Sequence, residues 1–246
     1  MKKFTHLFGV FMFTLLSISV AQAQDASLDD ILKNYYEKIG GVENWKKLES
    51  MKMTGKSTAM GMTSPVTMYT MKPNLSKREM NIMGKEMVIA FDGTDAWMIN
   101  PFDGSEGAKK QGDEASKQSA KQKFEDELID YKEKGHQLEL SGTEELNGKN
   151  TYKVKMTKKE GDVMFYYFDA ENHLPVMMRM LLTEGQAKGE VLEIHMRDYK
   201  EVDGLYFSHT MEQKIGEKSL FSFTADKVEF NLKEIDEAFF AMPAKE

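Results

Sequence analysis

Apolar and polar positions alternate in short runs between Ser64 and Phe102, which is the pattern of antiparallel strands. Tight turns separate these runs, because glycine and the Asp-Gly pair favour hairpin geometry. The pattern predicts four strands, at Ser64–Lys72, Leu75–Met83, Lys85–Phe91 and Thr94–Asn100. Side chains two residues apart share a face of a strand. One surface is therefore expected to carry Val66, Met68, Thr70 and Lys72, which combines apolar side chains with a single cation.

The rest of the chain predicts a helix first and further strands later. Ser27 to Ile39 has an apolar stripe at helical spacing, with a capping box of Ser27 and Asp30 at its start. Turn residues recur about every ten positions in the second half, which favours antiparallel β over βαβ units. The other expected elements are short helices at Val42–Leu48 and Leu232–Phe240 and strands at Ser50–Met60, Gln137–Thr143, Thr151–Lys158, Val163–Asp169, Leu174–Thr183, Glu190–Tyr199, Leu205–Lys214 and Ser219–Phe230.

Residues Gly104–Lys123 interrupt the strand pattern with a polar stretch rich in Gly, Ser, Lys, Gln and Glu. We interpret it as a mobile loop that leads into a helix at Ala115–Lys134. Only the second half of that helix has an apolar side. The segment is either a lid over a cavity or a solvated surface helix.

The first 23 residues have the pattern of a secretory signal peptide. Lys2 and Lys3 precede an apolar stretch that is short for a membrane span, and Ala21-Gln22-Ala23 fits the cleavage rule. Residues 24–246 are then expected to form one exported domain. The alternative is an uncleaved N-terminal anchor. Removal of residues 1–23, which contain these two lysines and no acidic residue, changes the net charge from −7 to −9. This negative charge argues against nucleic-acid binding.

Several motifs between Lys72 and Phe102 resemble those of the periplasmic carriers of outer-membrane lipoproteins, the LolA-like family. The matching residues are Lys72-Pro73-Asn74-Leu75, Asp92-Gly93, Trp97 and Asn100-Pro101-Phe102. The resemblance implies an α+β fold, mainly antiparallel β, in which an open half-barrel is covered by helices around a cavity for acyl chains. In that family an arginine precedes the proline, whereas this chain has Lys72.

Catalytic and metal-binding patterns are missing from the sequence. The chain has no cysteine, no Gly-x-Ser-x-Gly motif and no zinc-protease pattern. Glu193, His195 and His209 can approach one another across a hairpin, but a polar outer face explains them better than a metal site does. We therefore expect a protein that is not an enzyme and needs no cofactor or metal.

Methionine is unusually frequent, since 18 of the 20 methionines follow the predicted cleavage site. Methionine side chains repack around varied ligands, as a cavity for acyl chains requires, although they also serve as ordinary core residues. Lys72 either orients an ester or carbonyl oxygen or only extends from a strand end. In the first case, Lys72→Leu should slow lipid release. The predicted ligand-binding residues are Lys72, Val66, Met68, Met87, Ile89, Phe91, Trp97, Phe124 and Leu128.

These observations favour a monomeric periplasmic carrier that binds the acyl chains of a lipid or lipoprotein and delivers them toward the outer membrane. By resemblance alone, its partners are an inner-membrane release complex and an outer-membrane acceptor. The main alternative is a periplasmic sensor or interaction module with the same fold and no transport role. A lipid-modifying hydrolase is a further alternative, but the sequence shows no nucleophile–base pair.

Overall fold

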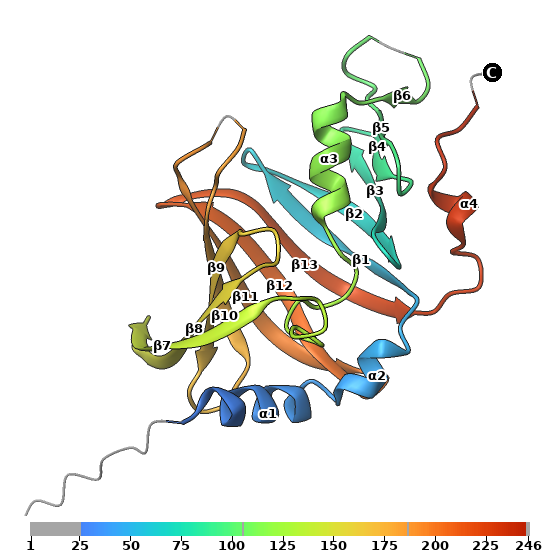
Figure 1. The fold of residues 1–246 in the computed structure, drawn as a ribbon. Coiled ribbons are helices and arrows are strands. Elements are labelled where there is room, and N and C mark those ends of the chain that lie inside the picture. The colour runs from blue at the N-terminus through green and yellow to red at the C-terminus, as the bar shows by residue number, and fades with distance from the viewer. Residues whose placement is uncertain (1–25, 105, 186, 245–246) are drawn as a thin grey trace, which may run out of the picture.

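The computed structural model describes residues 26–104, 106–185 and 187–244. The predicted signal peptide and its cleavage site lie outside these ranges. Most of the described chain forms one open, strongly curled antiparallel sheet, with helices on both of its sides (Figure 1). The helices are α1 (Leu28–Lys38), α2 (Val42–Lys46), α3 (Asp113–Lys121) and α4 (Glu237–Phe240).

The sheet contains 13 strands in the order β6-β5-β4-β3-β2-β1-β13-β12-β11-β10-β9-β8-β7. Each connection along β1–β5 and β7–β13 is therefore a hairpin, and β1 and β13 join the two halves of the chain. The strands are β1 (Ser50–Ala59), β2 (Met62–Met71), β3 (Leu75–Ile82), β4 (Lys85–Phe91), β5 (Ala96–Ile99), β6 (Lys109–Lys110), β7 (Gln137–Leu146), β8 (Lys149–Thr157), β9 (Val163–Asp169), β10 (Pro175–Leu181), β11 (Val191–Val202), β12 (Leu205–Ile215) and β13 (Lys218–Phe230).

A bulge in β1 makes the junction of the two halves dependent on one glycine. The register between β1 and β13 shifts between Thr54 and Gly55. A Cβ atom at Gly55 would lie 2.0 Å from the carbonyl oxygen of Thr224, so only glycine fits there. This close approach holds the two strands together at the centre of the sheet.

The register divides the side chains between an inner face, which carries Val66, Met68 and Met80, and an outer face, which carries Tyr69 and Trp97. The inner face of β7–β10 is the main core, and α1 packs against it through Ile31, Leu32, Tyr35 and Ile39. The capping box predicted at Ser27 is present, with both hydrogen bonds to Asp30. The outer face of β2 and β3 is covered by α4, whose Phe239 ring lies 4.7 Å from the ring of Tyr69.

The predicted helix at Ala115–Lys134 is confirmed only in its first part and is wrong beyond Lys121. The structure has α3 at Asp113–Lys121 and then a series of turns, which we call the covering segment (residues 122–136). Leu128 and Ile129 are adjacent, and both are buried beside α1. Tertiary packing of neighbouring side chains against one core overrides the helical spacing that the sequence displays. The C-terminal helix is also shorter than predicted, because α4 begins only at Glu237.

Candidate functional site

An apolar band crosses the inner face of the central strands. The register aligns Met87 with Met80, Met80 with Val66, and Met211 with both Phe223 and Met196. Most of these side chains are only half-buried, and Ile89 is 38% exposed. We call this set the inner band; its members are Val66, Met68, Met80, Met87, Ile89, Ile194, Met196, Met211, Phe221 and Phe223. Such a surface offers adaptable apolar contacts along several strands.

Arg78 is the cation of the inner band. It pairs with Met68 and Ile89 across β3, and its guanidinium lies 4.9 Å from the centre of the Phe221 ring. Since β2 and β1 separate β3 from β13, the side chain reaches across the curled sheet. It makes no hydrogen bond or ion pair with any side chain in the described ranges. Burial lowers the pKa of the guanidinium from its usual value.

An arginine that is partly desolvated and has no anionic partner can form strong hydrogen bonds with a ligand. Its planar fork suits a carboxylate, a phosphate or an ester carbonyl. The apolar residues around it supply contacts for a hydrocarbon chain. The inner band and Arg78 together therefore fit an amphipathic ligand with an acceptor oxygen at one end.

Lys72 directly follows the last residue of β2, Met71, and its side chain already has protein partners. Its Nζ donates to the carbonyl oxygen of Lys46 at 2.7 Å and to Glu49 at 3.3 Å, and it lies 3.6 Å from Glu125. These contacts connect the end of β2 with α2 and the covering segment. The inner band thus receives its positive charge from Arg78, and the expected single cation on this surface is not Lys72.

The other predicted ligand-binding residues fall into separate environments. Val66, Met68, Met87, Ile89 and Phe91 alternate onto the inner face, although Phe91 is fully buried. The three remaining residues lie elsewhere. Trp97 is on the outer face and donates to the carbonyl oxygen of Phe240 at 2.9 Å, Phe124 lies beside Trp45, and Leu128 belongs to the core under α1.

In Figure 1, α3 lies beside the strands β3–β5, and its side chains contact two separate parts of the chain. Near β5, the Ser116 hydroxyl accepts a hydrogen bond from the backbone N–H of Ala96 at 3.0 Å. On the other side, Gln118 and Lys121 contact Glu184 in the β10–β11 connection at 3.0 and 2.9 Å. The pair of Lys121 and Glu184 is half exposed, so it stabilises this position only weakly.

The covering segment is fixed to α1 by a partly buried acid. The Tyr35 hydroxyl donates to Asp126, and the Tyr36 hydroxyl donates to the carbonyl oxygen of Leu128 at 2.6 Å. Burial raises the pKa of the Asp126 carboxyl, and hydrogen bonds from Tyr35 and Leu128 only partly oppose this effect. The segment is therefore held beside the core by a group that is costly to ionise.

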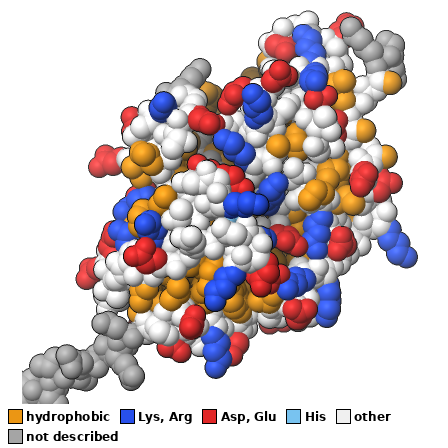
Figure 2. Space-filling model, in the orientation of Figure 1, with side chains coloured by type: hydrophobic (Ala, Val, Ile, Leu, Met, Phe, Trp, Pro, Cys, Tyr) orange, Lys and Arg blue, Asp and Glu red, His pale blue; other side chains and the backbone are white. Residues whose placement is uncertain are grey.

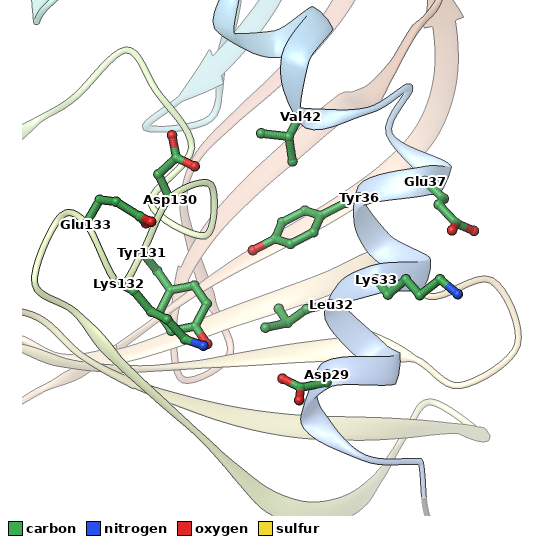
Figure 3. Close-up of a pocket in the computed structure, with 10 residues that line it drawn as sticks. All are labelled: Asp29, Leu32, Lys33, Tyr36, Glu37, Val42, Asp130, Tyr131, Lys132 and Glu133. Atoms are coloured by element: carbon green, nitrogen blue, oxygen red, sulfur yellow. The ribbon is translucent and has the colours of Figure 1, made fainter.

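A pocket of about 420 Å³ lies between α1 and residues 130–133, apart from the inner band. Tyr36 and Leu32 point from α1 toward this segment, and charged side chains surround them (Figure 3). Acidic and basic groups are both present, and one of them, Asp130, is paired with Lys46 at 2.7 Å. The mixed charge and open shape do not select one class of ligand.

The chemistry of the described residues agrees with a binding surface. No group of three or more His, Asp or Glu side chains in the described ranges is arranged to hold a metal ion. Glu193 is paired with Arg179 and His195 on the outer face. Basic and acidic side chains are interspersed over the visible surface in Figure 2. None of the helices in the described ranges has both the length and the apolar character needed to cross a bilayer.

Solved structures share this architecture at low sequence identity. A DUF1329 family protein from Desulfovibrio piger aligns over 85% of this chain and 97% of its own, with 12% identity and a TM-score of 0.57. The same coverage holds for an outer membrane lipoprotein-sorting protein domain from Vibrio parahaemolyticus, with 12% identity and a TM-score of 0.54. It also holds for a LolA superfamily protein from Nitrosomonas europaea, with 10% identity and a TM-score of 0.53. The chain has a LolA-like fold. The resemblance predicted from the sequence is therefore confirmed at the level of the fold.

By sequence, no family model and no curated protein matches the chain. The likeness to solved structures consequently concerns the LolA-like fold, and the function has to be argued from the site. Sequence reasoning missed Arg78 as the inner-face cation. The signal was present, because Arg78 shares the period of two with Met80 in the predicted strand at Leu75–Met83.

Proposed function

We propose that the protein is a periplasmic carrier that binds the acyl chains of a lipid or lipoprotein on its inner band and delivers them toward the outer membrane. Residues 24–246 would act as one domain after removal of the signal peptide. The partners would be an inner-membrane release complex and an outer-membrane acceptor. We propose a binding role without catalysis and without a cofactor.

The observation that carries this proposal is the combination of the inner band with Arg78. Each methylene transferred from water into apolar surroundings contributes about 0.8 kcal/mol, so a single long acyl chain would bind tightly. The guanidinium, which has no ion-pair partner among the described residues, would hold an acceptor oxygen of the ligand and fix which end of the chain lies near Phe221. The half-buried methionines would adapt to chains of different length and saturation.

Methionine-methyl NMR tests where a lipid binds. The delipidated protein, labelled with ¹³C at the methionine methyl groups, is titrated with a stearate that carries a nitroxide on its chain. We expect the nitroxide to broaden the signals of Met80, Met87 and Met211 first. Met242 is exposed beyond α4, and Met177 is buried on the outer face, so both serve as internal controls.

Uniform broadening of all exposed methionines would indicate unspecific contact and would count against the proposal. No broadening at the inner band would also reject it. In that case the same fold would be better explained as an interaction module, and purification from the native host together with a membrane-anchored protein and without lipid would support that role.

A further inference from the structure

One end of the sheet carries exposed apolar side chains at successive turns. Because neighbouring strands are antiparallel, the tips of the β1–β2 and β3–β4 hairpins and the chain after β5 lie at the same end. We call this edge the hairpin rim; it consists of residues 59–62, 82–85 and 100–102. Its exposed large apolar side chains are Met60 (94%), Met62 (55%), Met83 (86%) and Phe102 (50%).

The turns of the hairpin rim have an unusual residue for their backbone geometry. Two pairs on the rim, Met60-Gly61 and Met83-Gly84, have positive φ at both residues, and so do Asn147-Gly148 and Asp203-Gly204 on the opposite end of the sheet. Such turns favour Asn or Asp at the first position, because these short polar side chains tolerate the left-handed region. The turns at the opposite end follow this preference, whereas both turns of the rim have methionine at the first position.

Local folding therefore does not explain the two rim methionines. They adopt a disfavoured backbone conformation, and this cost is not offset by packing because they bury almost none of their side-chain surface. An exposed apolar side chain kept at such a position indicates a contact with something outside the molecule. Because two turns on adjacent hairpins share this feature, the contact would engage the rim as a unit.

We propose that the hairpin rim docks onto the surface of a lipid bilayer. The two tips at residues 59–64 and 81–84 carry no charge, although the chain as a whole is acidic. Lys85 lies 5.4 Å from the centre of the Phe102 ring, and lysine beside an exposed aromatic residue suits the headgroup region. A bilayer accepts separate apolar side chains without shape complementarity, whereas a protein partner requires a continuous matching surface.

Docking in this orientation would bring the inner band next to the bilayer. On β3, Ile82 alternates onto the same face as Met80, and on β2, Met62 shares the face of Val66 with Ser64 between them, so apolar side chains of the inner face continue to the rim. A hydrocarbon chain would then pass between membrane and inner face along apolar side chains. Bilayer docking itself does not rest on the proposed carrier function, because it requires only the rim.

Vesicle flotation with phosphatidylcholine vesicles tests the proposal on residues 24–246. We expect the wild type to float with the vesicles and Met60→Asn/Met83→Asn to partition at least about tenfold less, given the apolar burial lost at each tip. The double variant should be at least as heat-stable as the wild type, because asparagine suits both turns. Loss of flotation would then not reflect unfolding. Met242→Asn makes the same chemical change away from the rim and should float as the wild type does.

Three results would overturn bilayer docking. The wild type fails to float, the double variant floats equally well, or the wild type forms a dimer in sedimentation equilibrium that the double variant abolishes while neither protein binds vesicles. Binding of dodecanoate in solution, measured on the same variants, should remain unchanged. Failure of the rim and failure of the inner band can therefore be distinguished.

Discussion

Arg78→Met should affect stability and ligand binding in opposite directions. The wild-type guanidinium is partly buried, contacts Phe221 and lacks an anionic partner among the described residues. Methionine retains most of the apolar stem and matches the neighbouring side chains of the inner band. Removal of a desolvated charge that has no partner should leave the free energy of unfolding unchanged or raise it by up to about 1 kcal/mol.

Ligand binding should instead become weaker and lose its preference for an acid. A hydrogen bond to a charged group contributes about 1.5 to 3 kcal/mol, which corresponds to roughly a ten- to hundredfold change in Kd. The wild type should therefore bind dodecanoate more tightly than dodecanol by about this factor, and Arg78→Met should bind both with similar affinity. Arg78→Lys keeps the charge without the planar fork and should give an intermediate preference.

The assay is calorimetric titration of the delipidated variants with each of the two ligands, with thermal unfolding measured on the same samples. Lys72→Leu is the matched control, because it removes a cation that is already paired with Glu49 and Glu125. It should lower stability and retain the preference for dodecanoate. Equal preference in the wild type and Arg78→Met would refute the role assigned to Arg78.

Four further substitutions test other parts of the structure. Lys121→Glu places like charges opposite Glu184 and should accelerate dodecanoate release in stopped-flow displacement while Tm changes little; an unchanged release rate would contradict the interpretation of this segment as a lid over the cavity. The Thr70 hydroxyl is buried without a hydrogen-bond partner in the described ranges, so Thr70→Val should stabilise the protein by about 1 kcal/mol, whereas Thr151→Val removes a 2.6 Å bond to a carbonyl oxygen and should destabilise it by a similar amount in urea unfolding. Burial raises the pKa of Asp126, so its protonated form favours the fold: this contribution is complete below the unfolded pKa and is lost as the pH rises through the folded pKa. The stability of the wild type relative to Asp126→Asn should therefore increase as the pH falls from neutral, and a difference independent of pH would exclude this linkage.

The strands were predictable because successive side chains along each strand face opposite sides of the sheet, which are different environments. Lys85–Phe91 and Val163–Asp169 have the predicted bounds, and the open antiparallel sheet is confirmed. Pairs such as Asn147-Gly148 and Asp203-Gly204 fix turns locally, and their positive φ angles agree with the residues found there. Local rules were therefore sufficient for the β architecture.

The covering segment depends on tertiary contacts that no local pattern contains, and the inner-face cation depends on them in part. Leu128 and Ile129 are adjacent and pack against α1, which is distant in sequence, so helical spacing is misleading there. The period of two groups Arg78 with Met80 and separates it from the adjacent Lys77, and the register of β3 shows that the face of Arg78 is the inner one. Lys77 points outward, where it lies 2.9 Å from Glu79 and 4.3 Å from the ring centre of Phe239.

Binding of a lipid acyl chain by the inner band is the property on which the proposed carrier function depends. Its most direct test is mass spectrometry of an organic-solvent extract of the protein, purified from its native host without detergent. We predict that the wild-type extract contains phospholipid or acylated peptide in stoichiometric amount. The amount should be strongly reduced in a variant with Met80→Glu in the inner band. An extract without lipid from protein that is folded by circular dichroism would contradict the account.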